Sequence, residues 1–242
     1  MRLLAIDAGN TRIKWGVHEA GAWHATGSVA THEPQALGRA LQGQGPLHRA
    51  VACNVAGPAV ESELDRTTRG LGATLRLVHP APRAAGVVNG YRDALQLGPD
   101  RWAALVAARA LGPSATVVAT AGTALTVDAL SSAGEFLGGL IVAGPMLMRR
   151  ALESGTARLR DTDGHYSDFP ASTADAITSG AIQACAGAIE RMAELLAARE
   201  GATPAIVLSG GAAREISPHL PLAHSIRENL VLEGLVRLDL EG

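Results

Sequence analysis

The stretch that decides the fold is Leu3–Val17, which reads LLAIDAGNTRIKWGV. Four apolar residues precede Asp7, and a Gly-Asn pair separates them from a second apolar run. Gly and Asn tolerate the positive φ that a two-residue turn demands, so we expect a strand, a tight turn and a second strand. An ordinary hairpin with an acidic corner would give the same pattern.

The expected turn carries groups that suit phosphate chemistry. Backbone N–H groups of small residues can bind phosphate oxygens. Asp7 can hold Mg²⁺ directly or through water, and Lys14 can meet a phosphoryl group during its transfer. The turn is therefore a candidate phosphate site.

Length and charge narrow the class of protein. The chain has 242 residues and is 47% hydrophobic, which is enough for one large domain or two of ordinary size. A net charge of -2 gives no electrostatic signature for nucleic acid or an anionic membrane, so we expect neither partner.

Cysteine usage and hydropathy indicate a compartment. Cys53 and Cys185 lie far apart without CxxC spacing, which argues against zinc and against a disulfide framework. We read both as buried neutral thiols. The apolar residues before Asp7 are too few for a signal peptide, and later apolar stretches are interrupted before ~18 residues, so we expect a soluble cytoplasmic protein.

The first half of the chain alternates between strand and helix periodicity, which predicts the order βββαβαβ. The expected strands are 3–6, 12–17, 21–29, 49–55 and 74–78, and the expected helices are 34–42 and 58–71.

Residues 79–97 lack periodicity and contain loop residues, so we expect a long loop of the kind that is often functional. A helix should follow from Gly98 to Leu111, with Asp100 in its first turn, where the helix dipole favours a charged carboxylate. The alternative is that Asp100 is only a capping residue.

An internal repeat is the most informative feature. Thr116–Asp128 repeats the plan of the opening hairpin: one fixed offset places Ala8-Gly9 on Ala121-Gly122 and residues 21–23 on residues 134–136. We expect a pseudo-twofold fold whose two turns bind a nucleotide's phosphates from both sides. A chance match over so few identities is the alternative.

The rest of the second half predicts a strand at 136–143, a helix at 146–152, a polar loop at 158–170 and a long helix at 173–199. Small residues on the long helix suit close packing against another helix, which a second subunit could supply; they are Gly180, Ala181, Ala184 and Gly187. A strand at 205–208, a turn at 209–212 that could lie against an adenosine, and a helix from Asn229 complete the chain.

An ordered set of motifs resembles the type III pantothenate kinases, a family also described as Bvg accessory factors. The motifs are Asp7–Thr11 with Lys14, Gly98–Arg101, Gly122–Ala124, Gly138-Gly139 before Gly144-Pro145, Thr173, Ser209–Gly211 and Asn229-Leu230. The resemblance covers essentially the whole chain, and no P-loop motif is present. It implies an α/β fold of two ribonuclease-H-like domains, 1–112 and 113–242, with mixed sheets flanked by helices, as in the actin, Hsp70 and sugar kinase superfamily.

The resemblance also implies ATP-dependent phosphorylation of pantothenate to 4′-phosphopantothenate, the first step of coenzyme A biosynthesis. Carried over by position, ATP would contact Asp7, Ala8, Gly9, Asn10, Thr11, Arg12, Ile13, Lys14 and Thr123. Asp7 would also hold Mg²⁺, and Asp100 would be the catalytic base. Pantothenate would contact Tyr91, Gly98, Pro99, Asp100, Arg101 and Thr173.

Two further expectations come from the family. Its members are homodimers, with the position of Thr173 near the partner's pocket. The family usually carries Asp where this chain has Thr120, a position associated with K⁺ or NH₄⁺, so the monovalent cation site is in doubt here. Two alternatives to pantothenate kinase are another small-molecule phosphotransferase of the superfamily and a non-enzymatic regulatory accessory protein.

Overall fold

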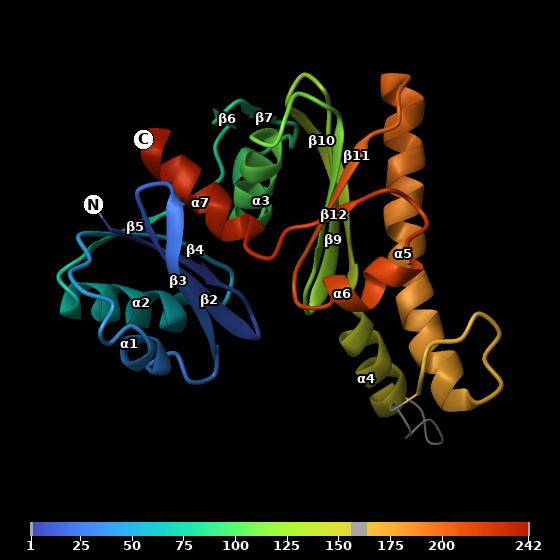
Figure 1. The fold of residues 1–242 in the computed structure, drawn as a ribbon, viewed down its shortest axis with the longest axis horizontal. Coiled ribbons are helices and arrows are strands. Elements are labelled where there is room, and N and C mark those ends of the chain that lie inside the picture. The colour runs from blue at the N-terminus through green and yellow to red at the C-terminus, as the bar shows by residue number, and fades with distance from the viewer. Residues whose placement is uncertain (1, 156–163, 242) are drawn as a thin grey trace. The chain divides into compact units, whose positions relative to one another are not determined.

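The computed structural model describes residues 2–155 and 164–241. The chain folds into two compact units: residues 1–111 together with 230–242, and residues 112–229. Each unit is a sheet with helices packed on it (Figure 1).

The sheet of the first unit has the strand order β3-β2-β1-β4-β5. Strands β1 to β3 are antiparallel, whereas β4 runs parallel to β1 and β5 runs parallel to β4. The elements are β1 (Leu3–Ala8), β2 (Arg12–Glu19), β3 (Ala22–Ala30), α1 (Ala36–Ala40), β4 (Arg49–Asn54), α2 (Pro58–Gly70) and β5 (Thr74–Leu77). The predicted order βββαβαβ is confirmed.

Alternation along the strands decides which face receives which helices. Leu4, Ile6 and Ala8 of β1 are fully buried in an apolar cluster with residues of α1 and α2, such as Leu37 and Leu64. Successive side chains of a strand point to opposite faces, so Asp7 lies on the other face. That face receives α3 (Pro99–Arg109) and α7 (Leu230–Glu241), as Figure 1 shows.

Helix α7 is fixed to the first unit by close packing and by charge. A Cβ at Gly234 would overlap the carbonyl oxygen of Ala103 in α3, so glycine lets the two helices approach. Near the C-terminal end of α7, the buried carboxylate of Asp239 pairs with Arg49 of β4 at 2.5 Å and with Arg76 of β5 at 3.9 Å. A buried carboxylate needs such partners.

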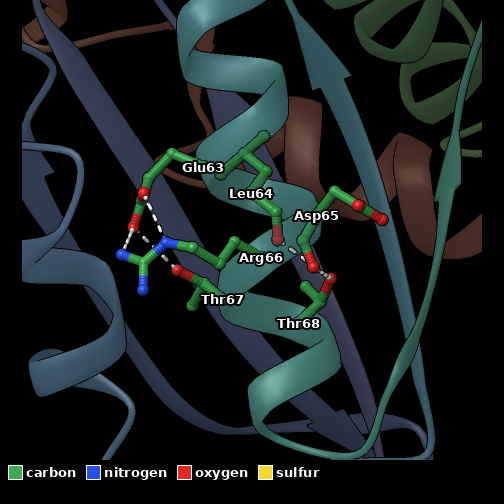
Figure 2. Close-up of polar contacts among 6 residues, drawn as sticks. All are labelled: Glu63, Leu64, Asp65, Arg66, Thr67 and Thr68. Carbon is green, nitrogen blue, oxygen red and sulfur yellow. Dashed lines mark hydrogen bonds and ion pairs between the residues drawn. The ribbon is translucent and has the colours of Figure 1, made fainter.

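Helix α2 satisfies its buried polar groups within itself (Figure 2). The hydroxyl of the buried Thr68 donates to the carbonyl oxygens of Leu64 and Asp65, at 2.9 and 3.1 Å. Arg66 forms two hydrogen bonds with the carboxylate of Glu63 on the exposed side. The helix can therefore bury a threonine at little cost.

The segment 79–97 is more regular than expected. Strands β6 (Arg83–Ala84) and β7 (Val87–Asn89) form a short hairpin, and the 3₁₀ helix η1 (Ala94–Gln96) follows, capped by the side chain of Asp93. The side chain of Asn89 accepts from the N–H of Tyr91 and donates to the carbonyl of Ala94, which fixes the backbone around Tyr91.

In the second unit the strands follow the order β12-β11-β8-β9-β10. Helix α5 packs its apolar side, including Cys185 and Ile189, against this sheet. The elements are β8 (Thr116–Ala121), β9 (Ala124–Leu130), β10 (Glu135–Ala143), α4 (Pro145–Gly155), α5 (Thr173–Glu200), β11 (Ala205–Ser209), α6 (Ala213–Ile216), the 3₁₀ helix η2 (Ser217–His219) and β12 (Ser225–Ile226). The predicted polar loop at 158–170 lies, up to residue 163, outside the described residues.

The internal repeat is present in the structure. Strands β1 and β8 end at Ala8 and Ala121, and β3 and β10 begin at Ala22 and Glu135, so the offset read from the sequence holds in three dimensions. Gly21 and Gly134, which match in the repeat, both adopt a positive φ, 86° and 84°.

The predicted conformation of the first turn is wrong. Neither Gly9 nor Asn10 has a positive φ. Three residues, not two, connect the strands, and the turn closes through a hydrogen bond from Gly9 N–H to the Arg12 carbonyl at 3.1 Å. The Thr31 hydroxyl also donates to the Gly9 carbonyl at 2.7 Å. These bonds hold a wider turn that needs no left-handed residue.

The domain boundary remains a prediction. The two compact units separate near the expected residue 112, and α7 belongs to the first unit rather than the second. Among the described residues, no helix is both long enough and apolar enough to cross a bilayer.

Candidate active site

Three side chains form a row across β2, β1 and β4, the central strands of the first sheet. Asp7 of β1 is paired in register with Lys14 of β2 on one side and with Cys53 of β4 on the other. Residues paired in register share a face of the sheet, so all three side chains lie on the face that carries α3 and α7. The buried thiol of Cys53 donates to Oδ1 of Asp7 at 3.4 Å.

The environment of Asp7 makes its carboxyl group unusually basic. Burial first and then the nearby charge of Asp100 raise its pKa, while Lys14 and the Cys53 thiol act in the opposite direction, and the net effect is a rise from 3.8 to about 6. Burial and the two carboxylates raise the pKa of the Cys53 thiol well above its usual value, so this group stays protonated. Asp7 and Asp100 thus form a like-charged acid pair.

Asp100 lies in the first turn of α3, as predicted, but it does not cap the helix. The N-cap is Gly98, and no side chain caps that end. Oδ1 of Asp100 accepts from the N–H of Arg101 at 2.8 Å. A Cβ at Gly98 would lie 2.5 Å from this Oδ1, whereas the backbone of Gly98, at φ -59° and ψ 135°, would suit any residue. Glycine therefore leaves space for the Asp100 carboxylate.

Arg101 and Tyr91 form a second cluster in the first unit. The side chain of Arg101 is 5% exposed, and its Nη1 donates to the hydroxyl oxygen of Tyr91 at 3.0 Å. The guanidinium carbon lies 5.7 Å from the centre of the Tyr91 ring, within cation–π range. Arg101 lies on α3, and Tyr91 lies in the segment whose backbone Asn89 fixes, so the two residues hold each other in place.

The turn between β1 and β2 exposes its tip. Asn10, Thr11 and Arg12 are exposed, while Ala8 and Ile13 at the two strand ends are fully buried. The guanidinium of Arg12 donates to the hydroxyl oxygen of Ser28 on β3, at 2.8 and 3.1 Å. The predicted phosphate-binding segment is therefore anchored at both ends and presents its middle.

The corresponding row in the second unit carries hydroxyl groups. Thr120 of β8 occupies the position that the repeat matches to Asp7. It is paired in register with Thr126 of β9 and with Ser209 of β11. Thr123 lies exposed in the following turn, where its carbonyl accepts from the N–H of Gly144 at 2.9 Å. This row has oxygen ligands but no side-chain charge.

Two glycines let backbone segments approach closely beside that turn. A Cβ at Gly144 would overlap the carbonyl oxygen of Gly122, and a Cβ at Gly210 would overlap the backbone of Ala121. Gly210 also has a positive φ of 95°. A hydrogen bond from Ala212 N–H to the Ala121 carbonyl, 3.0 Å, closes the contact. Main chain rather than side chains forms this part of the unit.

The remaining predicted residue and a hollow on the first unit lie elsewhere. Thr173 is the exposed first residue of α5, which Ser172 caps by accepting from the Asp175 N–H at 3.1 Å. A hollow of about 490 Å³ on the first unit lies beside α2 and β5 and contains none of the predicted site residues; its lining is Glu61, Ser62, Asp65, Arg69, Leu75, Leu77 and His79.

The family model and two relatives similar in sequence point to the same family. The family model for type III pantothenate kinase matches residues 3–195. This chain belongs to the type III pantothenate kinase family. A type III pantothenate kinase of Nitrosospira multiformis is 45% identical over 98% of this chain and 90% of its own length. The corresponding protein of Aromatoleum aromaticum is 46% identical over 96% of each chain.

A solved structure supports the fold class of this type III pantothenate kinase family member. A ROK family glucokinase from Streptomyces griseus, solved with glucose and AMPPNP, matches with a TM-score of 0.54 at 13% identity, covering all of this chain and 99% of the other. At this identity the likeness concerns the fold alone. The predicted sugar kinase fold is confirmed. Membership of the family identifies the protein as a kinase.

Sequence reasoning missed two features of this kinase. Cys53 was read only as a buried thiol; it is indeed free and buried, but it also contacts Asp7. The space that Gly98 leaves for Asp100 was missed as well. The sequence signals the contact between Cys53 and Asp7 only in that each residue stands at the end of an apolar strand segment. It signals the space beside Asp100 only in that Gly98 precedes Asp100 by two residues.

Proposed function

We propose that this protein transfers the γ-phosphoryl group of ATP to the primary hydroxyl of pantothenate, giving 4′-phosphopantothenate in the first step of coenzyme A biosynthesis. The observation that carries the proposal is the acid pair Asp7 and Asp100, held beside Lys14 in a member of this kinase family. Phosphoryl transfer to an alcohol needs a base for the hydroxyl proton and cations for the phosphate charge.

Asp100 would be the base. The alcohol proton is lost as its oxygen attacks, and a carboxylate within hydrogen-bond reach accepts it. Asp100 lies in the first turn of α3, and Gly98 leaves its Oδ1 uncrowded. Asp7, whose pKa is raised by burial and by Asp100, is given a different role in this proposal, that of the metal ligand.

Asp7 would hold Mg²⁺, and the donor set fits that ion. No group of three or more His, Cys, Asp or Glu side chains suited to a metal occurs among the described residues. Mg²⁺ commonly binds through one or two carboxylates together with substrate phosphates, so a half-buried carboxylate beside a like charge is a suitable ligand. Once bound, Mg²⁺ would neutralise charge on the transferred group.

The two turns would bind the ATP phosphates. In the first unit Ala8 to Ile13 would offer backbone N–H groups, and Lys14 would meet the transferred phosphoryl group. In the second unit Thr123 would also bind phosphate, in a turn where glycines bring the backbone close. The turn at Ser209–Ala212 would lie against the adenosine.

The substrate end would be built around Arg101. Its guanidinium, held by Tyr91, suits the carboxylate of pantothenate. Gly98 and Pro99 would line the same pocket beside Asp100. Thr173 would complete it from the partner subunit of a homodimer.

The homodimer is proposed on the exposed side of α5. Gly180, Ala184 and Gly187 are exposed, and a Cβ at either glycine would meet nothing, so a second helix could approach closely. Ala181, also predicted on this side, is instead buried in the unit. Light scattering at micromolar concentration measures the oligomeric state; a monomer would contradict this part of the proposal.

Two further points complete the proposal. Thr120 would give a monovalent cation, K⁺ or NH₄⁺, an uncharged ligand, so any cation site would be weaker than one with a carboxylate. Both cysteines are free, which fits a reducing compartment, and we propose the cytoplasm.

A coupled assay of ADP release with and without pantothenate tests the function. We expect ADP release to depend on pantothenate, and mass spectrometry of the product to show one added phosphate. A panel of other alcohols is the control. Faster turnover of a different acceptor, or no pantothenate-dependent ADP release at all, would contradict the proposal.

A further inference from the structure

Cys53 makes a contact that the proposed chemistry does not use. Its side chain is 1% exposed and lies at the end of β4, beside Asp7 of the parallel strand β1. The thiol donates to Oδ1 of Asp7 at 3.4 Å, although the two residues are 46 positions apart in the chain. This geometry results from strand register, not from local sequence.

The other buried cysteine provides a contrast. Cys185 lies on α5 in the apolar core of the second unit, and its sulfur is 4.0 Å from the Ala143 carbonyl oxygen. It behaves as a small apolar residue, the ordinary role of a buried thiol. Cys53 instead faces a carboxylate, so filling space does not account for its placement.

The contact limits how the Asp7 carboxylate can turn. A carboxylate has two oxygens and a soft terminal torsion, so without a partner either oxygen can be presented. The Cys53 thiol occupies Oδ1 from the β4 side, while Lys14 stands on the β2 side. Hydrogen bonds to metal-ligating groups orient them, and Mg²⁺ demands near-ideal geometry.

We propose that Cys53 is a positioning residue for Asp7, whose thiol hydrogen bond fixes the orientation in which the carboxylate meets the metal bound with ATP. The inference rests on the function proposed above, because it takes Asp7 as the Mg²⁺ ligand. It assigns Cys53 no contact with the substrates.

Three substitutions separate the hydrogen bond from packing. Cys53→Ala removes both the donor and part of the volume, Cys53→Val removes the donor and fills the site with an apolar side chain one heavy atom larger, and Cys53→Ser keeps a donor. The same three substitutions at Cys185 are the matched controls. Thermal unfolding checks that each variant folds; if Cys53→Ala does not fold, the comparison of Val with Ser decides.

The measured quantity is the gain in affinity that Mg²⁺ gives to a non-hydrolysable ATP analogue. Calorimetry gives the Kd of the β,γ-imido analogue with EDTA and with saturating Mg²⁺, and the ratio of the two is the gain. We expect Cys53→Ala and Cys53→Val to lower the gain about 3- to 10-fold, the weak end for an outer partner of a ligand, because a thiol is a weak donor. Cys53→Ser and the Cys185 variants should stay within about twofold of wild type, as should all Kd values in EDTA.

Two results would overturn the inference: an unchanged gain in both Cys53→Ala and Cys53→Val, or a gain restored by Val but not by Ser, which would show packing alone. Asp7→Asn separates this failure from failure of the proposed function. If wild type phosphorylates pantothenate and Asp7→Asn removes the gain, an unchanged Cys53→Val contradicts only the role of Cys53. If wild type shows no Mg²⁺ gain, the proposed role of Asp7 fails and this inference fails with it.

Discussion

The two repeated hairpins place different chemistry on the same scaffold. At the end of β1 the row across the sheet is Lys14, Asp7 and Cys53. At the end of β8 the matching row is Thr126, Thr120 and Ser209. The first carries two charged side chains, whereas the second carries three hydroxyl groups.

The difference extends to what surrounds each row. In the first unit Asp100, from α3, acts on Asp7 through its charge. In the second unit Gly144 and Gly210 press their backbone against the turn that follows β8. The comparison shows that the two copies share their strands and turn positions. The charged side chains lie in the first copy, and the closely packed main chain lies in the second.

The sharpest way to break the comparison is to remove the proposed base, Asp100, from the charged copy. Asp100→Asn keeps the shape of the side chain but cannot accept the alcohol proton, so kcat should fall ~10²-fold or more. Binding of ATP should survive, as calorimetry can check. Near-wild-type turnover at neutral pH would rule out the base role.

In the second unit the largest effect should come from crowding the backbone. Gly210→Ala adds a Cβ against Ala121 and forces a positive φ on alanine, which should cost about 2–4 kcal/mol and lower Tm by roughly 5–15 °C. The matched control is Gly211→Ala, since a Cβ there meets nothing. Equal Tm values for the two variants would show that the close contact does not constrain this turn.

A third substitution tests the space beside Asp100. Gly98→Ala should displace the Asp100 carboxylate and lower kcat about 10-fold, because a misplaced base loses rate while the helix remains. Circular dichroism should show an unchanged fold. Gly70→Ala, at a position where a Cβ meets nothing, is the control and should keep wild-type kcat. A Gly98→Ala enzyme with full turnover would show that Asp100 tolerates another rotamer.

The acid pair predicts a pH effect with a definite sign. The pKa of Asp7 is raised from 3.8 to about 6, so its ionisation destabilises the fold at pH values above about 6, and this destabilisation disappears as the pH falls below about 4. Carboxyl NMR titration of the ligand-free protein should place the Asp7 midpoint near 6. In Asp100→Asn the midpoint should fall, because the like charge is gone.

Asp175 is the control in that titration. Hydrogen bonds from the Ser172 side chain and the His165 backbone lower its pKa in the second unit, and Asp100→Asn should not move it. An Asp7 midpoint that stays unchanged in Asp100→Asn would contradict the pairing of the two acids.

The smallest expected effect concerns Thr120, the counterpart of Asp7. Thr120→Asp adds a charge to the hydroxyl row and should lower the K⁺ concentration for half-maximal activation several-fold. Wild type should need more K⁺ than a relative with a carboxylate at this position, or should need no K⁺ at all. Titration of KCl against a choline background measures this. Tight, saturable K⁺ activation of wild type that Thr120→Asp leaves unchanged would show that this side chain does not govern the cation.

The sequence by itself determined the local elements and their repetition. Apolar periodicity located the strands and long helices, the fixed offset between Ala8 and Ala121 located the second hairpin, and Asp100 was placed in the first turn of its helix. The pattern of motifs also gave the family. All of these depend on neighbouring residues or on order along the chain, which a sequence displays directly.

Only the tertiary structure decided which distant residues meet. The register between β1 and β4 places Cys53 on Asp7, and the docking of α7 places Asp239 between Arg49 and Arg76. The wide first turn is held by Thr31, the residue that directly follows β3. Each of these contacts joins segments separated by long stretches of chain, and their pairing depends on how the whole sheet packs, so no local propensity encodes it.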